Sequence, residues 1–228
     1  MIQHVYERAV ASGAEQVIVA TDDRRIADAV ASFSGDVCMT ASSHTSGTDR
    51  IAEVAASYRW PAETIVVNLQ GDEPLMPPAL LGEVAGVLSD HPAAEVSTLA
   101  VPMDAPEQLF DPNTVKVVTD RAGYALYFSR APIPWHRDRF DITAQPESDW
   151  LTDMHRHLGI YAYRAGFLSD YARLEAAPIE AMESLEQLRV LWHGGRIAVG
   201  VASTTPPAGV DTPSDLERVA AVLAGQRA

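Results

Sequence analysis

The sequence has one cysteine, one lysine and no apolar run long enough to cross a bilayer. The single cysteine, Cys38, excludes an internal disulfide and any metal centre built from several cysteines, and it is typical of a reducing compartment. The apolar stretches fall short of the ~20 residues that a membrane helix needs, and the sequence does not begin with a basic-then-apolar leader. We therefore expect a cytoplasmic protein without a membrane span.

Basic residues are few, and almost all of them are arginine. Of the 17 basic residues 16 are arginine and only Lys116 is lysine, against 31 acidic residues and a net charge of −14. This balance argues against nucleic acid as a partner, although arginines or a metal ion can attract a small anion to one pocket. Loops that hold phosphate usually contain a lysine, and no residue before Lys116 can supply one.

The 228 residues, 47% of them apolar, predict a single domain over 1–228 in which helices and strands alternate. Helices are expected over 2–12, 23–33, 51–58, 78–88, 166–175, 180–192 and 213–224. Strands are expected over 16–21, 36–39, 64–69, 96–101, 114–119, 123–128, 157–163 and 196–202. This rhythm favours an α/β, Rossmann-like fold with a mostly parallel sheet covered on both faces. Residues 131–155 predict a small excursion over the surface or over a partner.

Ligands of such sheets bind beyond the carboxyl ends of the strands, and two acidic residues follow predicted strands there. Asp72 lies in the turn after the strand 64–69, where an ordinary polar turn is an equal alternative. Asp211 precedes the last helix, which Thr212 and Asp215 can cap by themselves. Asp211 therefore has no evident structural role, and the two aspartates together suggest a Mg²⁺ site for phosphate chemistry.

Other segments give weaker signals, each with a structural alternative. Gly47 and Arg50 lie at a predicted helix start that can bind an anion, and Arg130 offers a planar fork for a carboxylate, although surface arginines are common. His157 can contact a polyhydroxy substrate or be purely structural. Glu183 and Gln187 are four residues apart on a predicted helix, where a solvated face is the default interpretation.

Taken together, these segments resemble one known family. In chain order they are SGTDR (46–50), VVNLQGDEP (66–74), NTVKVVTD (113–120), GYALYFSRAPIPW (123–135), RHLGIYAYRAGF (156–167), ESLEQLRVLWHG (183–194) and GVDTPSDLERV (209–219). The ordered set is similar to the 3-deoxy-manno-octulosonate (KDO) cytidylyltransferases, also named CMP-KDO synthetases. The similarity extends over nearly the whole chain, and it is the order of the segments that makes it specific.

The resemblance implies a nucleotide-diphosphosugar transferase fold, a Mg²⁺ cofactor and a homodimer. It implies that CTP and KDO react to give CMP-KDO and pyrophosphate for lipopolysaccharide synthesis. Asp72 and Asp211 would hold Mg²⁺ and act in catalysis. The nucleotide would contact Gly47, Thr48, Arg50 and Gln70. The sugar would contact Arg130, His157, Tyr161, Glu183 and Gln187, with Glu186 as an adjacent candidate.

The sequence departs from the family pattern at its start. The family begins with a strand and a glycine-containing loop whose arginine and lysine hold the CTP phosphates, and this sequence begins at the equivalent of the helix that follows. We therefore expect a chain truncated at its N-terminus, with two strand edges left unpaired. The alternatives are a degenerate, non-catalytic binding or assembly subunit and a cytidylyltransferase for a related 2-keto sugar acid.

Overall fold

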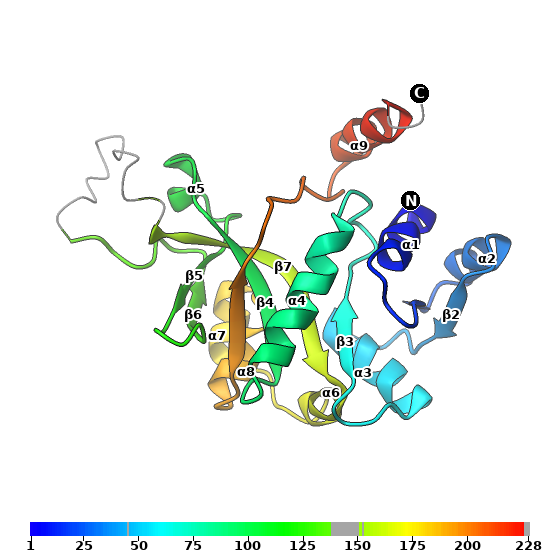
Figure 1. The fold of residues 1–228 in the computed structure, drawn as a ribbon, viewed down its shortest axis with the longest axis horizontal. Coiled ribbons are helices and arrows are strands. Elements are labelled where there is room, and N and C mark those ends of the chain that lie inside the picture. Colours follow the sequence, from blue (N-terminus) through cyan, green and yellow to red (C-terminus); the bar gives the residue numbers. More distant parts are fainter. Residues whose placement is uncertain (45, 138–150, 152, 226–228) are drawn as a thin grey trace.

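The computed structural model describes residues 1–44, 46–137, 151 and 153–225 (Figure 1). The helices are α1 (Ile2–Ala11), α2 (Arg24–Ser32), α3 (Gly47–Tyr58), α4 (Pro78–Asp90), α5 (Glu107–Phe110), α6 (Ala165–Tyr171), α7 (Pro178–Glu183), α8 (Leu188–Trp192) and α9 (Pro213–Gly225). The strands are β1 (Ile18–Thr21), β2 (Asp36–Met39), β3 (Ile65–Asn68), β4 (Val96–Pro102), β5 (Lys116–Thr119), β6 (Ala125–Ser129), β7 (His155–Arg164) and β8 (Ile197–Val201). None of the helices in these ranges has the length and apolar character that a bilayer crossing requires.

The central sheet is mixed, because its longest strand runs against most of its neighbours. β7 pairs antiparallel with β4 along one edge, and with β3 and β5 along the other. β8 lies parallel to β4 on the outside, and β6 pairs antiparallel with β5. Consequently β3, β4, β5 and β8 share one direction, while β6 and β7 have the opposite one. The α/β class is confirmed, and the sheet is less parallel than the sequence suggested.

β1 and β2 form a separate parallel pair beside this sheet (Figure 1). In the part of the chain that the structure describes, β1 pairs only with β2 and β3 pairs only with β7. One edge of each of these two strands therefore has no strand partner among the described residues. α3 contacts both β1 and β3 and so connects the two sheets.

The core lies on both faces of the central sheet. On one face α4 packs Leu80 and Leu88 into a cluster that includes Leu158 and Ile160 of β7. On the other face α3, α6 and α8 cover a second cluster that includes Tyr161. The alternation of side chains along β7 therefore places Tyr161 away from α4.

One predicted helix is wrong in a way that affects the site. The expected helix 180–192 is two short helices, because Ser184 adopts a left-handed conformation with φ 51° and ends α7. Glu183 and Gln187 are therefore not neighbours on one helix face. Met182 and Trp192, near the ends of these two helices, are 82% and 55% exposed. Of the predicted excursion over 131–155, residues 138–150 and 152 lie outside the described residues.

Candidate active site

The two acidic segments singled out in the sequence lie against each other. The loop after β3 contains Asp72. The backbone carbonyl oxygen of Asp72 accepts a hydrogen bond from the Val210 N–H at 2.9 Å. Gly209 allows this close approach, since a Cβ there would lie 2.9 Å from Glu73 Oε1 and 3.0 Å from the Asp72 carbonyl oxygen. The segment that carries Asp211 is therefore held beside the segment that carries Asp72.

The pKa of Glu73 reflects the nearby carboxylates of Asp72 and Asp211. Burial, together with the negative charges of Asp72 and Asp211, raises the pKa of Glu73 to about 7. Glu73 is not among the site residues predicted from the sequence, although the acidic pair directly after Gly71 is a usable signal. We call Asp72, Glu73 and Asp211 together the acidic corner. A cation bound there would relieve the repulsion between the carboxylates, and carboxylate oxygens are the ligands that Mg²⁺ prefers.

The same corner has the composition of a substrate-completed metal site. No group of three His, Cys, Asp or Glu side chains within the described ranges is arranged to hold a metal ion by itself. Mg²⁺ commonly takes one or two carboxylates and completes its ligands with water and substrate phosphates. Asp72 and Asp211 fit that ligand set.

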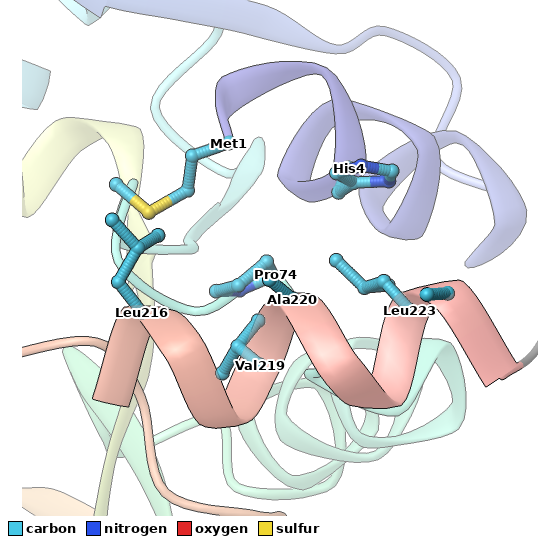
Figure 2. A pocket seen from close by; sticks show the side chains of 8 residues that line it. Met1, His4, Pro74, Leu216, Val219, Ala220 and Leu223 are labelled. Carbon is cyan, nitrogen blue, oxygen red and sulfur yellow. The ribbon is translucent and has the colours of Figure 1, made fainter. Parts of the chain in front are cut away.

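α9 begins two residues after Asp211 and lies next to the end of the loop that contains Asp72. Figure 2 shows a pocket of about 290 Å³ between α1 and α9, lined mainly by apolar side chains. Val219 of α9 is 2% exposed, and Pro74 at the end of the acidic loop also lines this pocket. The capping box expected at the start of α9 is confirmed: the Asp215 N–H donates to Thr212 Oγ1 at 3.2 Å, and the Thr212 N–H donates to Asp215 Oδ2 at 3.0 Å. The cap does not use Asp211.

A second pocket, of about 330 Å³, opens beside the acidic corner. Gln70, from the same loop as Asp72, is one of its lining residues. The others are Asn113, Thr114, Val115, Arg156, His157, Gly159, Tyr161, Ser184, Leu185, Glu186 and Gln187. Three of the predicted sugar ligands therefore share one cavity with a predicted nucleotide ligand.

The hydrogen bonds of His157 define its tautomer. Thr98 Oγ1 lies 2.7 Å from the Ile160 carbonyl oxygen, 3.0 Å from the Leu158 carbonyl oxygen and 2.9 Å from His157 Nε2. The carbonyl oxygens can only accept, so the single hydroxyl proton of Thr98 goes to one of them and His157 Nε2 must donate. His157 Nδ1 is then the acceptor. Burial lowers the pKa of His157 to about 3, so the ring is neutral near pH 7.

Gln187 brings an unused donor to the pocket. The residue is 5% exposed, and its Nε2 has no hydrogen-bond partner within the described ranges. An unsatisfied buried amide is costly unless a ligand completes it. Gln187 therefore has the features of a group that is satisfied by substrate.

The N-terminus of α3 reaches the pocket through Glu186. Ser46 caps α3, because its Oγ accepts the Asp49 N–H at 3.1 Å. Burial raises the pKa of Glu186, and the nearby hydroxyls of Thr48 and Ser46 partly offset this shift. Thr48 Oγ1 also lies 3.1 Å from the Tyr163 hydroxyl. Glu186 thus joins the predicted nucleotide segment to the pocket, which makes it a stronger candidate than its place in the sequence suggested.

Arg50 and Gly47 lie at the carboxyl ends of strands, as expected for ligand contacts. Arg50 Nη1 donates to Thr40 Oγ1 at 2.5 Å, just after β2, and Nη2 lies 3.4 Å from Asp22 Oδ1, just after β1. A Cβ on Gly47 would lie 3.5 Å from Asn68 Nδ2 at the end of β3. The carboxyl ends of three strands therefore meet around the start of α3.

Arg130 and Glu183 lie next to the pocket, beside its lining residue Ser184. The Arg130 guanidinium donates to the carbonyl oxygens of Glu183 at 2.7 Å, Pro112 at 2.8 Å and Ser184 at 3.4 Å. The Glu183 carboxylate accepts the Ser129 hydroxyl at 2.6 Å and the Arg130 N–H at 3.0 Å. Neither residue lines the described pocket, so Glu183 binds its own chain where the sequence suggested contact with a hydroxyl of the sugar.

Comparison with known proteins agrees with this geometry. A protein-family model described as cytidylyltransferase matches residues 1–197. The chain belongs to this family. A 3-deoxy-manno-octulosonate cytidylyltransferase from Nitrosococcus oceani is 54% identical over 228 residues, which cover 99% of this chain and 87% of the relative. One from Tolumonas auensis is 56% identical over 219 residues, covering 96% of this chain and 85% of the relative.

Solved structures show the same fold. A CMP:2-keto-3-deoxy-manno-octonic acid synthetase complexed with CTP superposes with a TM-score of 0.85 at 41% identity, covering 99% of this chain and 88% of that one. A 4-diphosphocytidyl-2C-methyl-D-erythritol synthase has a TM-score of 0.56 at 13% identity, covering 96% of this chain and 88% of that one, and it supports the fold alone. The family and the fold class predicted from the sequence are confirmed.

Proposed function

We propose that this cytidylyltransferase joins CTP and KDO to give CMP-KDO and pyrophosphate, and so activates KDO for lipopolysaccharide synthesis. The observation that carries the proposal is the position of Gln70. Its loop supplies Asp72 to the acidic corner, and Gln70 itself lines the pocket that contains His157, Tyr161 and Gln187. Gln70 therefore connects the loop that carries Asp72 with a pocket whose neutral polar groups suit a sugar.

In this reaction the anomeric hydroxyl oxygen of KDO attacks the α-phosphorus of CTP, and the bond from that phosphorus to the oxygen of the leaving pyrophosphate breaks. Asp72 and Asp211 would hold Mg²⁺, which neutralises phosphate charge and acidifies a bound hydroxyl. Gly47, Thr48, Arg50 and Gln70 would contact the nucleotide. Phosphoryl transfer demands little covalent work from the protein, so positioning of the two substrates is the main task of these residues.

On the sugar side the residues have different tasks. His157 Nδ1 accepts a hydrogen bond from a hydroxyl, and its low pKa makes it a weak base that orients KDO without removing the proton. Gln187 and Tyr161 bind further oxygens. Arg130 uses three of its five N–H groups on the chain's own carbonyl oxygens, so two remain for the KDO carboxylate. Glu183 orients Arg130.

The cellular setting follows from the substrates. CTP is a cytoplasmic nucleotide, so we place the reaction in the cytoplasm. A homodimer is the proposed assembly, supported by the exposed Met182 and Trp192, which belong to adjacent short helices. Sedimentation velocity tests this assembly, and a monomer at micromolar concentration would contradict it.

The decisive experiment measures pyrophosphate release from CTP with and without KDO and Mg²⁺. We expect release only when all three are present, and no release from ATP or from sugar acids without the KDO skeleton. The test is run on this chain and on the chain with any in-frame residues that precede Met1. If neither releases pyrophosphate in a KDO-dependent manner, the proposal is wrong.

Asp211→Asn and Asp215→Asn form a matched pair for the same assay. Each removes one carboxylate near the start of α9: Asp211 lies just before the helix, and Asp215 lies in its first turn. Asp211→Asn should lose turnover by a factor on the order of 100 or more, while Asp215→Asn stays within about threefold of the parent. Equal losses in both variants would show that Asp211 acts only through the fold.

A further inference from the structure

Lys116 is the only lysine in the chain, and its side chain is completely buried. It begins β5 and is not a member of any ion pair in the described part of the chain. Burial of an ammonium group without an ion-pair partner is rare and costly. Such a residue needs a compensating set of contacts.

Those contacts are three backbone carbonyl oxygens. Lys116 Nζ donates to Thr114 at 2.6 Å, to Arg130 at 2.6 Å and to Asp111 at 3.0 Å. An ammonium has three donors, so the group is fully satisfied. Charge-assisted bonds of this kind are roughly twice as strong as neutral ones. Lys116 therefore draws together the loop before β5 and the residue that follows β6.

Arg130 extends this connection to the other side of the pocket. Its backbone carbonyl oxygen is bound by Lys116, and its guanidinium donates to Pro112 on one side and to Glu183 and Ser184 on the other. Residues 113–115 and residues 184–187 line the pocket from these two sides. Lys116 and Arg130 thus form one continuous connection beside the pocket.

We propose that Lys116 is a positioning residue that sets the affinity for the sugar acid by fixing Arg130 and the pocket residues 113–115. The inference rests on the proposed function and goes beyond it, because it assigns a task to a residue that touches neither substrate. It predicts that loss of the ammonium disturbs the sugar side of the crevice and leaves the nucleotide side, built from α3 and the acidic loop, intact.

The test compares Lys116→Met, which keeps an unbranched side chain one atom shorter and removes the charge, with Val117→Ala. Val117 is the next residue of β5, 3% exposed in the core, and its truncation destabilises the strand without touching the three carbonyl oxygens. We expect Lys116→Met to raise KM for KDO about tenfold, equivalent to ~1.4 kcal/mol, with KM for CTP within twofold of the parent. Val117→Ala should leave the ratio of the two KM values unchanged.

Hydrogen exchange gives a readout that does not need turnover. Amide exchange over 113–115 and 184–187 should accelerate in Lys116→Met and not in Val117→Ala. If the parent chain shows no KDO-dependent turnover, the proposed function fails, and exchange alone still decides whether Lys116 orders the pocket.

Equal changes in both KM values, or an exchange pattern shared with Val117→Ala, would overturn the inference. Lys116→Gln, which retains two amide donors, is the milder second variant and should show a smaller rise in KM for KDO. If neither lysine variant folds, Lys116 is required for the whole domain and the proposed local role is wrong.

Discussion

Replacing His157 by glutamine tests whether the fold keeps this imidazole neutral. Burial and, to a smaller extent, Arg156 lower the pKa of His157 to about 3 from its ordinary value of 6.5. Between these two values the unfolded chain binds more protons than the folded one, so the free energy of unfolding decreases as the pH falls. The stabilisation is fully present above the unfolded pKa and is lost progressively below it.

The magnitude follows from the two protonation states. At pH 5 the unfolded histidine is almost fully charged and the folded one almost fully neutral, which corresponds to about 2 kcal/mol less stability than at pH 7. This figure depends on the unfolded pKa, so an error of one unit in the folded pKa hardly alters it.

The assay is urea unfolding of the parent and His157→Gln at pH 7, 6 and 5. The comparison between variants is essential, because the raised pKa of Glu73 acts with the opposite sign in part of this range. Glutamine can still donate to Thr98 and cannot become charged, so the stability difference between the two proteins should shrink by about 2 kcal/mol from pH 7 to pH 5. A difference that does not change with pH would mean that His157 can be protonated in the folded state, and the neutral ring assigned to it near pH 5 would then be wrong.

Three further substitutions test the site. Gln187→Leu removes an amide whose Nε2 has no partner in the described part of the chain. Thermal melting should therefore show a stability equal to that of the parent or up to about 1 kcal/mol higher, while KM for KDO rises. A lower melting temperature would contradict this expectation. Gly209→Ala places a Cβ 2.9 Å from Glu73 Oε1. The free energy of unfolding should fall by about 1–3 kcal/mol, and half-maximal turnover should need more Mg²⁺. An unchanged Mg²⁺ titration would show that Gly209 does not affect metal binding at the acidic corner. Ser184→Gly removes the strain of a non-glycine residue at φ 51°. Urea unfolding should show the free energy of unfolding raised by up to about 1 kcal/mol. A lower free energy of unfolding would show that the serine side chain itself supports the turn.

Several features of the fold could be predicted because their causes are local. The helix that begins after Ser46 and the one that begins after Thr212 are both capped by neighbouring residues. Ser46 Oγ accepts the Asp49 N–H, and Thr212 and Asp215 form the full capping box. The cap at Thr212 also explains why Asp211 could be selected in advance, since a structural use for its carboxylate was already excluded. Short β-branched runs located most strands for the same reason.

The direction of β7 and the break at Ser184 could not be predicted, because tertiary contacts decide them. A strand pattern reports which faces are buried and says nothing about whether its neighbours run parallel. Residues 180–192 have an uninterrupted helical pattern with neither glycine nor proline at the break, yet Ser184 turns left-handed. That turn directs the Glu183 carboxylate to Ser129 and leaves Gln187 in the pocket, so the two residues do not share the helix face that the predicted helix gave them.

The least predictable part of the site is the part held together by backbone carbonyl oxygens. Six hydrogen bonds from Lys116 and Arg130 end on main-chain oxygens of residues that could be exchanged for others without losing the acceptor. The acceptor residues therefore cannot be predicted from their amino-acid type. Only the donors, Lys116 and Arg130, can be recognised in the sequence. For Lys116 the signal is a lone lysine among the β-branched residues of TVKVVT, where a charged side chain alternates onto a buried face and must find acceptors there.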